Sequence, residues 1–476
     1  MDKVKNAPLL NCLLDNEVDG LAVTNPATGE LIGHVPCATP EDVNTAIEQA
    51  AVAQKAWQQR SAEQRAEILL RWYQLLMSNK EDLARILTLE QGKPLSESRG
   101  EVAYGASFVQ WFAEEAKRAY GRSIPAPAND RRIITIKQPV GVAAAITPWN
   151  FPIAMITRKA APALAAGCAF VCKPAEATPL SAFAVAELAY QAGIPKELLS
   201  IIVSTNPAEV GEVLCQSETV RKLSFTGSTQ VGRKLIAQCA ATVKRTSMEL
   251  GGNAPFIVLA DADIPKAVEG AVKSKFRNAG QTCVCANRFY VHDSVYDEFI
   301  EQYKRAVATL VVGNGLNLDT DIGPLINAAA KEKVEQLIAS TLDAGATLIT
   351  GGKSLSGLFI QPTILGDVTQ SMPIVKEEIF GPVAPVIRFS DTNALLTMAN
   401  DSIFGLAAYF YGNNMAEIWH IAEALEFGMV GINEGIISSA VAPFGGVKQS
   451  GYGREGAQEG LDEYLDTKYL CFGGLE

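Results

Sequence analysis

Two short motifs of this 476-residue chain set a reactive side chain among small residues. Glu249 begins the segment Glu-Leu-Gly-Gly-Asn, and Cys283 lies in Gly-Gln-Thr-Cys-Val-Cys. Small neighbours let a substrate approach closely, so the thiol is a candidate nucleophile and the carboxylate a candidate general base. Taken alone, each residue is better explained as an inert buried cysteine or a surface glutamate.

Two other segments have features of a nucleotide site. Phe225-Thr-Gly-Ser-Thr-Gln-Val-Gly232 is expected where a strand turns into a helix over residues 233–241, with backbone N–H groups and the helix dipole facing a phosphate. It matches neither a P-loop nor GxGxxG, and a plain strand-to-helix turn explains it equally well. Lys173 and Glu176 follow an apolar strand, where a carboxylate can accept hydrogen bonds from ribose hydroxyls. A solvated ion pair is the alternative.

Histidine chemistry is hard to build from this sequence. The three histidines, His34, His292 and His420, lie far apart and belong to no HExxH or Cys/His cluster. A GxSxG nucleophile elbow is also missing from the sequence. We therefore predict no metal site and a nucleophile that works without histidine.

Composition and charge limit the class of protein. With 48% hydrophobic and 20% charged residues the chain is an ordinary globular protein, and its formal charge of −11 argues against a nucleic-acid or anionic-membrane partner. The nine cysteines show no repeated CxxC spacing, which favours free thiols in a reducing compartment. The longest apolar run, residues 160–172, contains Pro162 and Gly167 and is shorter than the ~20 residues that span a bilayer. We expect a cytoplasmic protein.

The elements that must position these residues follow an α/β pattern. The first hundred residues are expected to be mostly helical. From Gly141, short apolar runs alternate with helices that end at glycine, which is the rhythm of βαβ units, and a second such set begins at Pro255. Residues 132–138 alternate as an exposed strand that needs a partner, which a subunit interface could supply.

Taken together, the motifs resemble those of the aldehyde dehydrogenase superfamily along nearly the whole chain. The further segments that carry the resemblance are Thr147-Pro-Trp-Asn150-Phe-Pro152, Lys376-Glu-Glu-Ile-Phe-Gly-Pro382 and Pro443-Phe-Gly-Gly-Val-Lys-Gln-Ser-Gly451. Within the superfamily, residues 274–285 and 435–439 resemble the succinate-semialdehyde dehydrogenases. The resemblance implies a Rossmann-type cofactor domain, an α/β catalytic domain and a small β oligomerisation element.

The resemblance also assigns catalytic roles that agree with the chemistry. Cys283 would attack the aldehyde, hydride would pass to a nicotinamide, and the resulting thioester would be cleaved by water. The amide of Asn150 and the backbone N–H of the nucleophile would hold the oxyanion. Glu249 would activate the hydrolytic water.

The cofactor contacts implied by the resemblance are Thr147, Pro148, Trp149, Lys173, Glu176, Gly227, Ser228, Glu378 and Phe380. Lys173 and Glu176 would contact the adenosine ribose, and Gly227 with Ser228 the pyrophosphate. Glu378 and Phe380 would lie on the nicotinamide-ribose side. The carboxylate of Glu176 would repel a ribose 2′-phosphate, so NAD is expected and NADP is the alternative.

Arg158 and Arg277 correspond to carboxylate-binding arginines of succinate-semialdehyde dehydrogenases, and Ser438 would add a hydroxyl donor. The expected reaction is oxidation of succinate semialdehyde to succinate. Glutarate semialdehyde or another aldehyde is the nearest rival, because one methylene is worth only ~1–3 kcal/mol in a pocket. Two functions of a different class are the further alternatives: a thiol esterase and a non-catalytic structural protein. For Arg277 the alternative role is pairing with a structural acid.

The expected domains follow the same resemblance. Residues 1–121 and 142–250 would bind the cofactor, and residues 251–442 would form the catalytic domain. Residues 122–141 and 443–476 would form the oligomerisation element of a homodimer or homotetramer.

Cys285 suggests a redox switch beside the nucleophile. A sulfenic acid on Cys283 could condense with it to a disulfide if the loop brings the two Cα atoms to about 4.4–6.8 Å. The alternative is that Cys285 points into the core as a small apolar residue.

Overall fold

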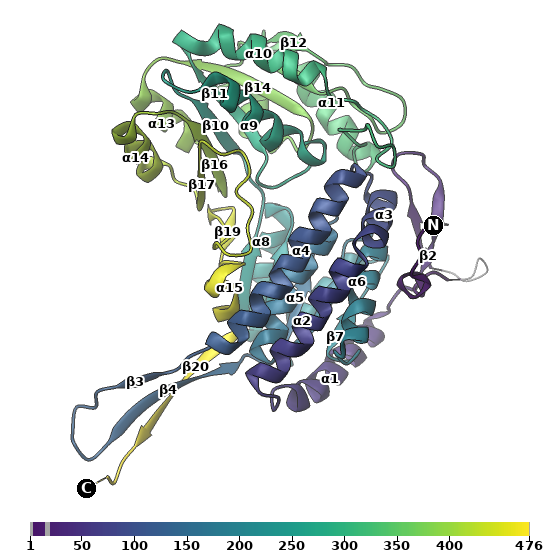
Figure 1. Ribbon diagram of the computed structural model, residues 1–476, viewed down its shortest axis with the longest axis vertical. Helices are drawn as coiled ribbons and strands as arrows, with labels where there is room; N and C mark the ends of the chain where they lie inside the picture. The colour runs from purple at the N-terminus through teal and green to yellow at the C-terminus, as the bar shows by residue number, and fades with distance from the viewer. Residues whose placement is uncertain (1–2, 15–19, 476) are drawn as a thin grey trace.

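The computed structural model describes residues 3–14 and 20–475. The chain forms two α/β lobes and a narrow three-stranded arm that projects from one of them (Figure 1). One hydrophobic core is built almost entirely from residues 9–250, together with a few residues near the C-terminus. The second core is built from residues 254–427 and Phe444. Two sets of βαβ units therefore produce two separate cores, as the repeated rhythm of the sequence predicts.

The first lobe contains a six-stranded sheet of order β19-β9-β8-β5-β6-β7. Its strands are β5 (Val142–Ile146), β6 (Ala169–Lys173), β7 (Leu199–Ile201), β8 (Val220–Thr226), β9 (Arg245–Glu249) and β19 (Gly451–Tyr452). All neighbours pair in parallel except β19 with β9. The chain runs from β5 outward to β7, then returns to β8 on the other side of β5. This reversal creates a crevice between β5 and β8, where open α/β sheets bind ligands.

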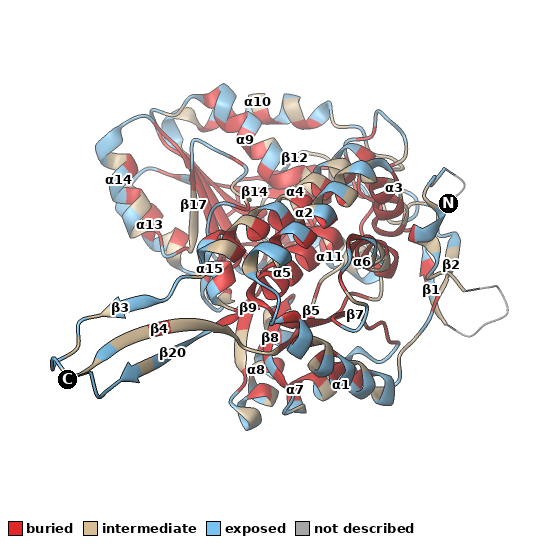
Figure 2. Ribbon diagram, turned by 60° about the horizontal axis from the view of Figure 1, so that its bottom comes forward, coloured by how far each residue is buried: buried red, intermediate tan, exposed pale blue. Residues whose placement is uncertain are grey.

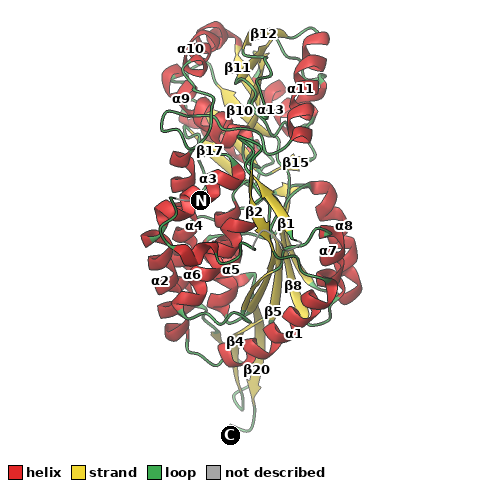
Figure 3. Ribbon diagram, turned by 90° about the vertical axis from the view of Figure 1, so that its right-hand side faces the viewer, coloured by secondary structure: helices red, strands yellow, loops and turns green. Residues whose placement is uncertain are grey.

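Helices cover both faces of this sheet. They are α1 (Pro40–Trp57), α2 (Ala62–Ser78), α3 (Lys80–Gln91), α4 (Leu95–Glu115), α5 (Pro152–Ala166), α6 (Pro179–Ala192), α7 (Pro207–Gln216) and α8 (Thr229–Cys239). In Figure 3, α2, α4, α5 and α6 lie on one side of the strands and α1, α7 and α8 on the other. Capping boxes begin α1 at Thr39 and α2 at Ser61, and Gly92 ends α3 with a φ of 95°.

The second lobe contains a seven-stranded sheet of order β12-β13-β14-β11-β10-β16-β17. Its strands are β10 (Ala254–Val258), β11 (Ala286–His292), β12 (Thr347–Thr350), β13 (Thr363–Gly366), β14 (Val383–Phe389), β16 (Ala407–Tyr411) and β17 (Met429–Ile432). Its helices are α9 (Ile264–Phe276), α10 (Tyr296–Ala308), α11 (Ala328–Asp343), α12 (Pro373–Lys376), α13 (Thr392–Asn400) and α14 (Met415–Ala424). Only the edge strand β12 pairs antiparallel, and every residue of β10 and β16 is buried, as central parallel strands require.

The arm is a sheet of order β20-β4-β3, made of β3 (Arg122–Ile124), β4 (Arg132–Pro139) and β20 (Leu465–Phe472), and α15 (Ala457–Asp462) precedes its last strand. The partner of the alternating strand thus comes from the C-terminus of the same chain, with Leu465 opposite Pro139 and Phe472 opposite Arg132. Figure 2 shows the arm mostly exposed or intermediate, away from both cores.

Short elements complete the fold: β1 (Leu21–Thr24) pairs with β2 (Leu31–Val35), and β15 (Phe404–Gly405) with β18 (Val447–Lys448). One sequence expectation is wrong in detail, because α8 begins at Thr229 and not at residue 233. The Ser228 side chain caps it by accepting from Val231 N, so the helix starts directly at the glycine turn. Within the described ranges, the structure has no helix both long and apolar enough to cross a membrane.

Candidate active site

The crevice of the six-stranded sheet gathers residues from four neighbouring strands. Thr147 follows β5, Lys173 ends β6, Gly227 follows β8 and Glu249 ends β9. Backbone hydrogen bonds tie these ends together, from Thr147 N to Lys173 O at 3.0 Å and from Gly227 N to Glu249 O at 3.0 Å. The parallel order of the sheet therefore brings together residues that lie far apart in the sequence.

A cavity of about 310 Å³ opens between the two lobes above this edge. The predicted residues that line it are Pro148, Trp149, Asn150, Gly227, Ser228, Cys283, Glu378 and Phe380. It is also lined by Leu250 and Ile379, which lie within the motifs but were given no role, and by Met155 and Lys333, which lie outside them. Nucleophile and cofactor-side residues, predicted from separate motifs, thus share one cavity.

Two N–H hydrogens at the nucleophile, one on the Asn150 amide and one on the Cys283 backbone, have no acceptor in the described part of the chain. Asn150 Nδ2 donates to Gln281 O at 3.0 Å, and no residue that the structure describes accepts its second hydrogen. The backbone N–H of Cys283 likewise makes no hydrogen bond to the described part of the chain. Gly252 packs directly beneath, since a Cβ there would lie 2.2 Å from Cys283 O. The pair of free donors is the arrangement that an oxyanion hole requires.

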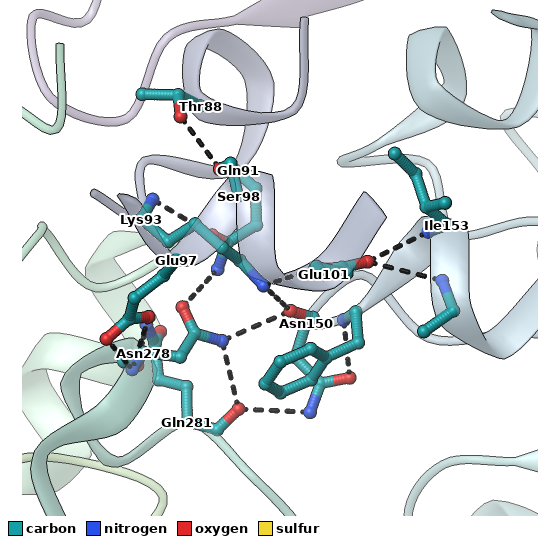
Figure 4. A network of polar contacts seen from close by, with 12 residues as sticks. Thr88, Gln91, Lys93, Glu97, Ser98, Glu101, Asn150, Ile153, Asn278 and Gln281 are labelled. Carbon is teal, nitrogen blue, oxygen red and sulfur yellow. Dashed lines mark hydrogen bonds and ion pairs between the residues drawn. The ribbon is translucent and has the colours of Figure 1, made fainter. Parts of the chain in front are cut away.

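Figure 4 shows a buried polar network behind Asn150. Lys93 Nζ donates to Asn150 O at 2.6 Å and to Glu101 at 2.6 Å, and Asn278 Nδ2 donates to Asn150 O at 3.1 Å. The other oxygen of Glu101 accepts from Ile153 N at 3.0 Å, at the start of α5. The Lys93 and Glu101 side chains are 0% exposed, so their charges are compensated by each other and by backbone groups. The network fixes the backbone that carries the Asn150 amide.

The segment that leads to the nucleophile is strained and held by the same network. Asn278 and Ala279 have φ angles of 52° and 54°, in the left-handed region that residues other than glycine rarely adopt. Glu97 accepts the Asn278 N–H at 2.8 Å, and Gln91 Nε2 donates to Asn278 Oδ1 at 2.9 Å. These contacts hold a conformation that costs of order 1–3 kcal/mol per residue.

Glu249 has an unusual environment for a carboxylate. It is 2% exposed, and neither oxygen has a hydrogen-bond partner among the residues described. Gly445 lies against it, with a Cβ there falling 2.8 Å from Glu249 Oε1. Burial, and next the charge of Glu455, raise the pKa of Glu249 well above its usual value. A carboxylate with a raised pKa is a stronger base, which suits proton removal near neutral pH.

The Cys283 thiol is protonated near neutral pH in this environment. Burial raises its pKa to about 12; the Arg158 guanidinium acts in the opposite direction, and the Glu249 carboxylate raises it further. Because the thiolate is the nucleophile, the reaction needs a base within reach.

Arg158 is held differently from what the resemblance implies. It is 1% exposed, and its Nε forms an ion pair with Glu455, which also pairs with Lys159. Phe444 covers the guanidinium at 4.2 Å from the ring centroid. One nitrogen, Nη1, has no partner in the described chain. The positive charge of Arg158 is therefore mostly compensated by Glu455, a residue that the sequence motifs did not indicate.

The other two predicted substrate residues are more accessible. Arg277 is partly exposed and lies 5.3 Å from the ring centroid of Phe151. It forms no ion pair with any described acid. The buried Glu97 carboxylate, which accepts the N–H of the next residue, is the acid on which its charge acts: burial raises the pKa of Glu97 to about 7, and Arg277 is among the cations that oppose this. Ser438 is half-buried in the loop after β17, and no hydrogen bond joins it to either arginine in the described chain.

On the cofactor side, Lys173 and Glu176 form an ion pair with each other. Glu378 accepts the Gly252 N–H at 3.0 Å, and burial raises the pKa of Glu378 to about 7. The rings of Trp149 and Phe380 meet edge to face at 5.6 Å. Carboxylates at both ends, two aromatic walls and the N-terminus of α8 between them fit a dinucleotide.

Cys285 is buried and, unlike Cys283, does not line the cavity. It is 5% exposed, and its Sγ contacts Lys275 O at 3.5 Å and Ala286 O at 3.4 Å. A disulfide with Cys283 would require the side chain to leave that packing. The redox role of Cys285 remains a prediction.

Comparison with known proteins agrees with this arrangement. The model of the aldehyde dehydrogenase family matches residues 14–470. This chain belongs to the aldehyde dehydrogenase family. It is 56% identical to a glutarate-semialdehyde dehydrogenase of Pseudomonas aeruginosa, covering 96% of this chain and 94% of the relative. It is 55% identical to the NADP(+) succinate-semialdehyde dehydrogenase of Escherichia coli, covering 96% and 95% of the two chains.

The fold is shared as closely as the sequence. A crystal structure of succinate-semialdehyde dehydrogenase from Burkholderia pseudomallei superposes with a TM-score of 0.96 at 52% identity, covering 99% of this chain and all of the other. The protein is thus an aldehyde dehydrogenase with the α/β fold of the family, and semialdehyde dehydrogenases are prominent among its relatives.

Proposed function

We propose that this aldehyde dehydrogenase oxidises succinate semialdehyde to succinate with NAD. The observation that carries the proposal is Arg277, a partly exposed cation that forms no ion pair within the described chain and belongs to the same segment as the nucleophile. Burial raises the pKa of Cys283, and the charges of Arg158 and then Arg277 oppose that rise, so Arg277 acts on the nucleophile electrostatically. An aldehyde with a distal carboxylate supplies the carbonyl that the thiol attacks and an anion for the arginine.

In the proposed mechanism Glu249 accepts the thiol proton, and Cys283 sulfur forms a bond to the aldehyde carbon. Asn150 Nδ2 and the Cys283 N–H stabilise the alkoxide of this thiohemiacetal. The nicotinamide cofactor, when bound, supplies the acceptor for the hydride. Loss of hydride leaves a thioester on Cys283, and Glu249, after releasing its proton to solvent, takes a proton from the attacking water. Cleavage of the carbon–sulfur bond then releases the carboxylate product and the thiolate.

The residues proposed to hold the cofactor are those of the crevice. Lys173 and Glu176 would contact the adenosine ribose, and Ser228 and Gly227 at the start of α8 the pyrophosphate. Glu378 would accept from the nicotinamide ribose. The carboxylate of Glu176, 36% exposed, supports NAD over NADP, because a 2′-phosphate there meets a like charge.

The two relatives quoted above are named for different substrates. One of the two quoted above is named for glutarate semialdehyde and the other for succinate semialdehyde with NADP. Glutarate semialdehyde is therefore the second candidate, and it differs by one methylene, worth ~1–3 kcal/mol in a pocket.

Domain roles and assembly follow as part of the same proposal. Residues 1–121 and 142–250 would bind the cofactor, and residues 251–442 would carry the nucleophile, which the two separate cores support. The projecting arm, with its exposed edge strands β3 and β20, supports an oligomerisation role for residues 122–141 and for β20 in a homodimer or homotetramer. The rest of the expected range 443–476 belongs to the lobes, because β19 joins the six-stranded sheet and Phe444 the second core.

The deciding experiment measures absorbance at the nicotinamide band with each aldehyde and each cofactor. The proposal expects the highest kcat/KM with succinate semialdehyde and NAD, and a much lower value with neutral butanal. Preference for glutarate semialdehyde would favour the second candidate. Ester cleavage without any aldehyde oxidation would favour the thiol esterase.

A further inference from the structure

The side chain of Tyr104 ends in a buried hydroxyl whose hydrogen has no acceptor among the residues described. It lies on α4, and its ring meets Phe108 edge to face at 4.9 Å, which fixes its direction. Its hydroxyl oxygen is buried and within reach of the Arg158 guanidinium, but arginine is a donor only, so the O–H hydrogen finds no acceptor within residues 3–14 and 20–475. A buried hydroxyl without a partner costs about 1–3 kcal/mol, so its presence needs an explanation.

The packing of α4 on α5 places this phenol beside the active site. Gly105 allows the close approach, because a Cβ there would lie 3.0 Å from Ile153 Cγ2 and 3.1 Å from Thr157 Oγ1. The Arg158 guanidinium lies 6.0 Å from the ring centroid of Phe108, the ring that Tyr104 contacts. Arg158 acts on the Tyr104 hydroxyl by its charge and as a side-chain hydrogen-bond donor, and the charge of Arg277 acts on it as well. Arg158 in turn acts on Cys283, so the phenol and the nucleophile flank one guanidinium.

The protonation state of the phenol suits a hydrogen-bond donor. Burial raises the pKa of Tyr104, although the two arginines act in the opposite direction, so the hydroxyl keeps its proton near neutral pH. Arg158 Nη1 beside it also lacks a partner in the described chain. Two buried donors in one place match the acceptor capacity of an anionic group, since a carboxylate offers about four lone-pair sites.

We propose that Tyr104 is a substrate-binding residue that determines specificity, donating its hydroxyl proton to the distal anionic group of the semialdehyde beside Arg158 and Arg277. This inference rests on the proposed function, because it requires a substrate with an anionic end. An aldehyde with an alkyl end leaves the hydroxyl unpaired, so Tyr104 favours the carboxylated substrate both by binding it and by penalising its neutral analogue.

The test is the variant Tyr104→Phe, which keeps the ring and its contact with Phe108. We expect kcat/KM for succinate semialdehyde to fall about ten- to hundredfold, the loss of one hydrogen bond to a charged group, mainly through KM. With butanal the value should change little or rise. The selectivity between the two aldehydes should therefore fall by a similar factor.

The matched control is Tyr303→Phe. Tyr303 is also a buried phenol without a partner in the described chain, but the only charged-group influence on it is that of Cys285. This variant should keep the selectivity of the unaltered enzyme. A similar loss in both variants would mean that any buried phenol in this fold matters, and would overturn the specific role of Tyr104.

The outcomes separate the two proposals. If the unaltered enzyme does not prefer succinate semialdehyde to butanal, the proposed function fails and the role of Tyr104 fails with it. If the enzyme has that preference and Tyr104→Phe retains it, only the role of Tyr104 is overturned. An equal loss for both aldehydes in Tyr104→Phe would show that the residue supports the structure and does not select the substrate.

Discussion

The two ends of the active site satisfy their polar groups differently. At the cofactor end, Lys173 pairs with Glu176, and Glu378 accepts a backbone N–H. At the substrate end, the described chain offers no partner for Tyr104 Oη, Arg158 Nη1 or either oxygen of Glu249. Unpaired buried groups of this kind cost about 1–3 kcal/mol each. Thr226 Oγ1 is the exception at the cofactor end, since it also lacks a partner in the described chain. The difference indicates that the charged groups of the cofactor end are paired in the folded protein, whereas those of the substrate end are completed by what they bind.

The first prediction tests the group on which both ends depend. Cys283→Ala should abolish aldehyde oxidation while nucleotide binding survives, because only the covalent step is lost. Turnover and nucleotide binding by fluorescence titration are the measurements. Cys285→Ala, two residues away and buried, is the control and should retain turnover. Oxidation at the normal rate by the Cys283 variant would remove the thiol from the mechanism.

The second prediction concerns an unpaired carboxylate of the substrate end. Glu249→Gln should lower steady-state turnover by about 10²–10⁴, with hydrolysis of the thioester as the slow step. Because Glu249 is also the proposed base for the thiol, the burst of hydride transfer on rapid mixing should be small near neutral pH. It should grow at alkaline pH, where the Cys283 thiol loses its proton without Glu249.

The same variant gives a pH test. Glu249 acts only when deprotonated, and its pKa is raised, so activity of the unaltered enzyme should increase with pH through that pKa. The increase should be absent from the hydrolysis step of Glu249→Gln. An unchanged pH profile would place the base elsewhere.

The third prediction tests whether a change at the substrate end affects a carboxylated aldehyde but neither a neutral aldehyde nor the cofactor. Arg277→Ala should cost about 1.5–3 kcal/mol in transition-state binding of succinate semialdehyde, the value of a hydrogen bond to a charged group. Butanal should lose much less, and the KM for the cofactor should not change. Arg221→Ala, which removes an exposed cation from β8, is the control. Equal losses for both aldehydes would indicate that Arg277 only supports the structure.

The same division decides how far the sequence alone leads. Residues at strand ends are predictable from the βαβ pattern, namely Lys173 and Gly227 at the cofactor end and Glu249 at the substrate end. The structure places all three at one sheet edge. Lys93 and Glu101 are not predictable in this way, because a lysine and a glutamate in a helical region look like surface residues. Their burial arises only when α4 packs against the loop that carries Asn150.

Other differences have equally local causes. The start of α8 at Thr229 depends on Ser228 accepting from Val231 N, a cap that could have been read from the serine at the glycine turn. Arg158 was assigned by resemblance to the substrate, but its pairing with Glu455 joins residues almost 300 positions apart, which no local pattern reveals.

The last prediction has the smallest effect and concerns the completed end. Glu176→Ser should raise the kcat/KM ratio of NADP to NAD, because the carboxylate that repels a 2′-phosphate is removed. We expect a change of about tenfold or less, since Glu176 is 36% exposed and solvent screens the repulsion. The substitution also frees Lys173 from its ion pair, so the lysine becomes available to the added phosphate.

Glu197→Ser is the control for that variant, because it removes the same charge at the opposite edge of the sheet, before β7 begins. It should leave the cofactor ratio unchanged. The change in Glu176→Ser should also shrink as salt is added, since the repulsion acts between partly exposed charges. A preference for NADP in the unaltered enzyme would contradict the assignment of NAD. It would mean that the Lys173 ammonium outweighs the Glu176 carboxylate that it pairs with.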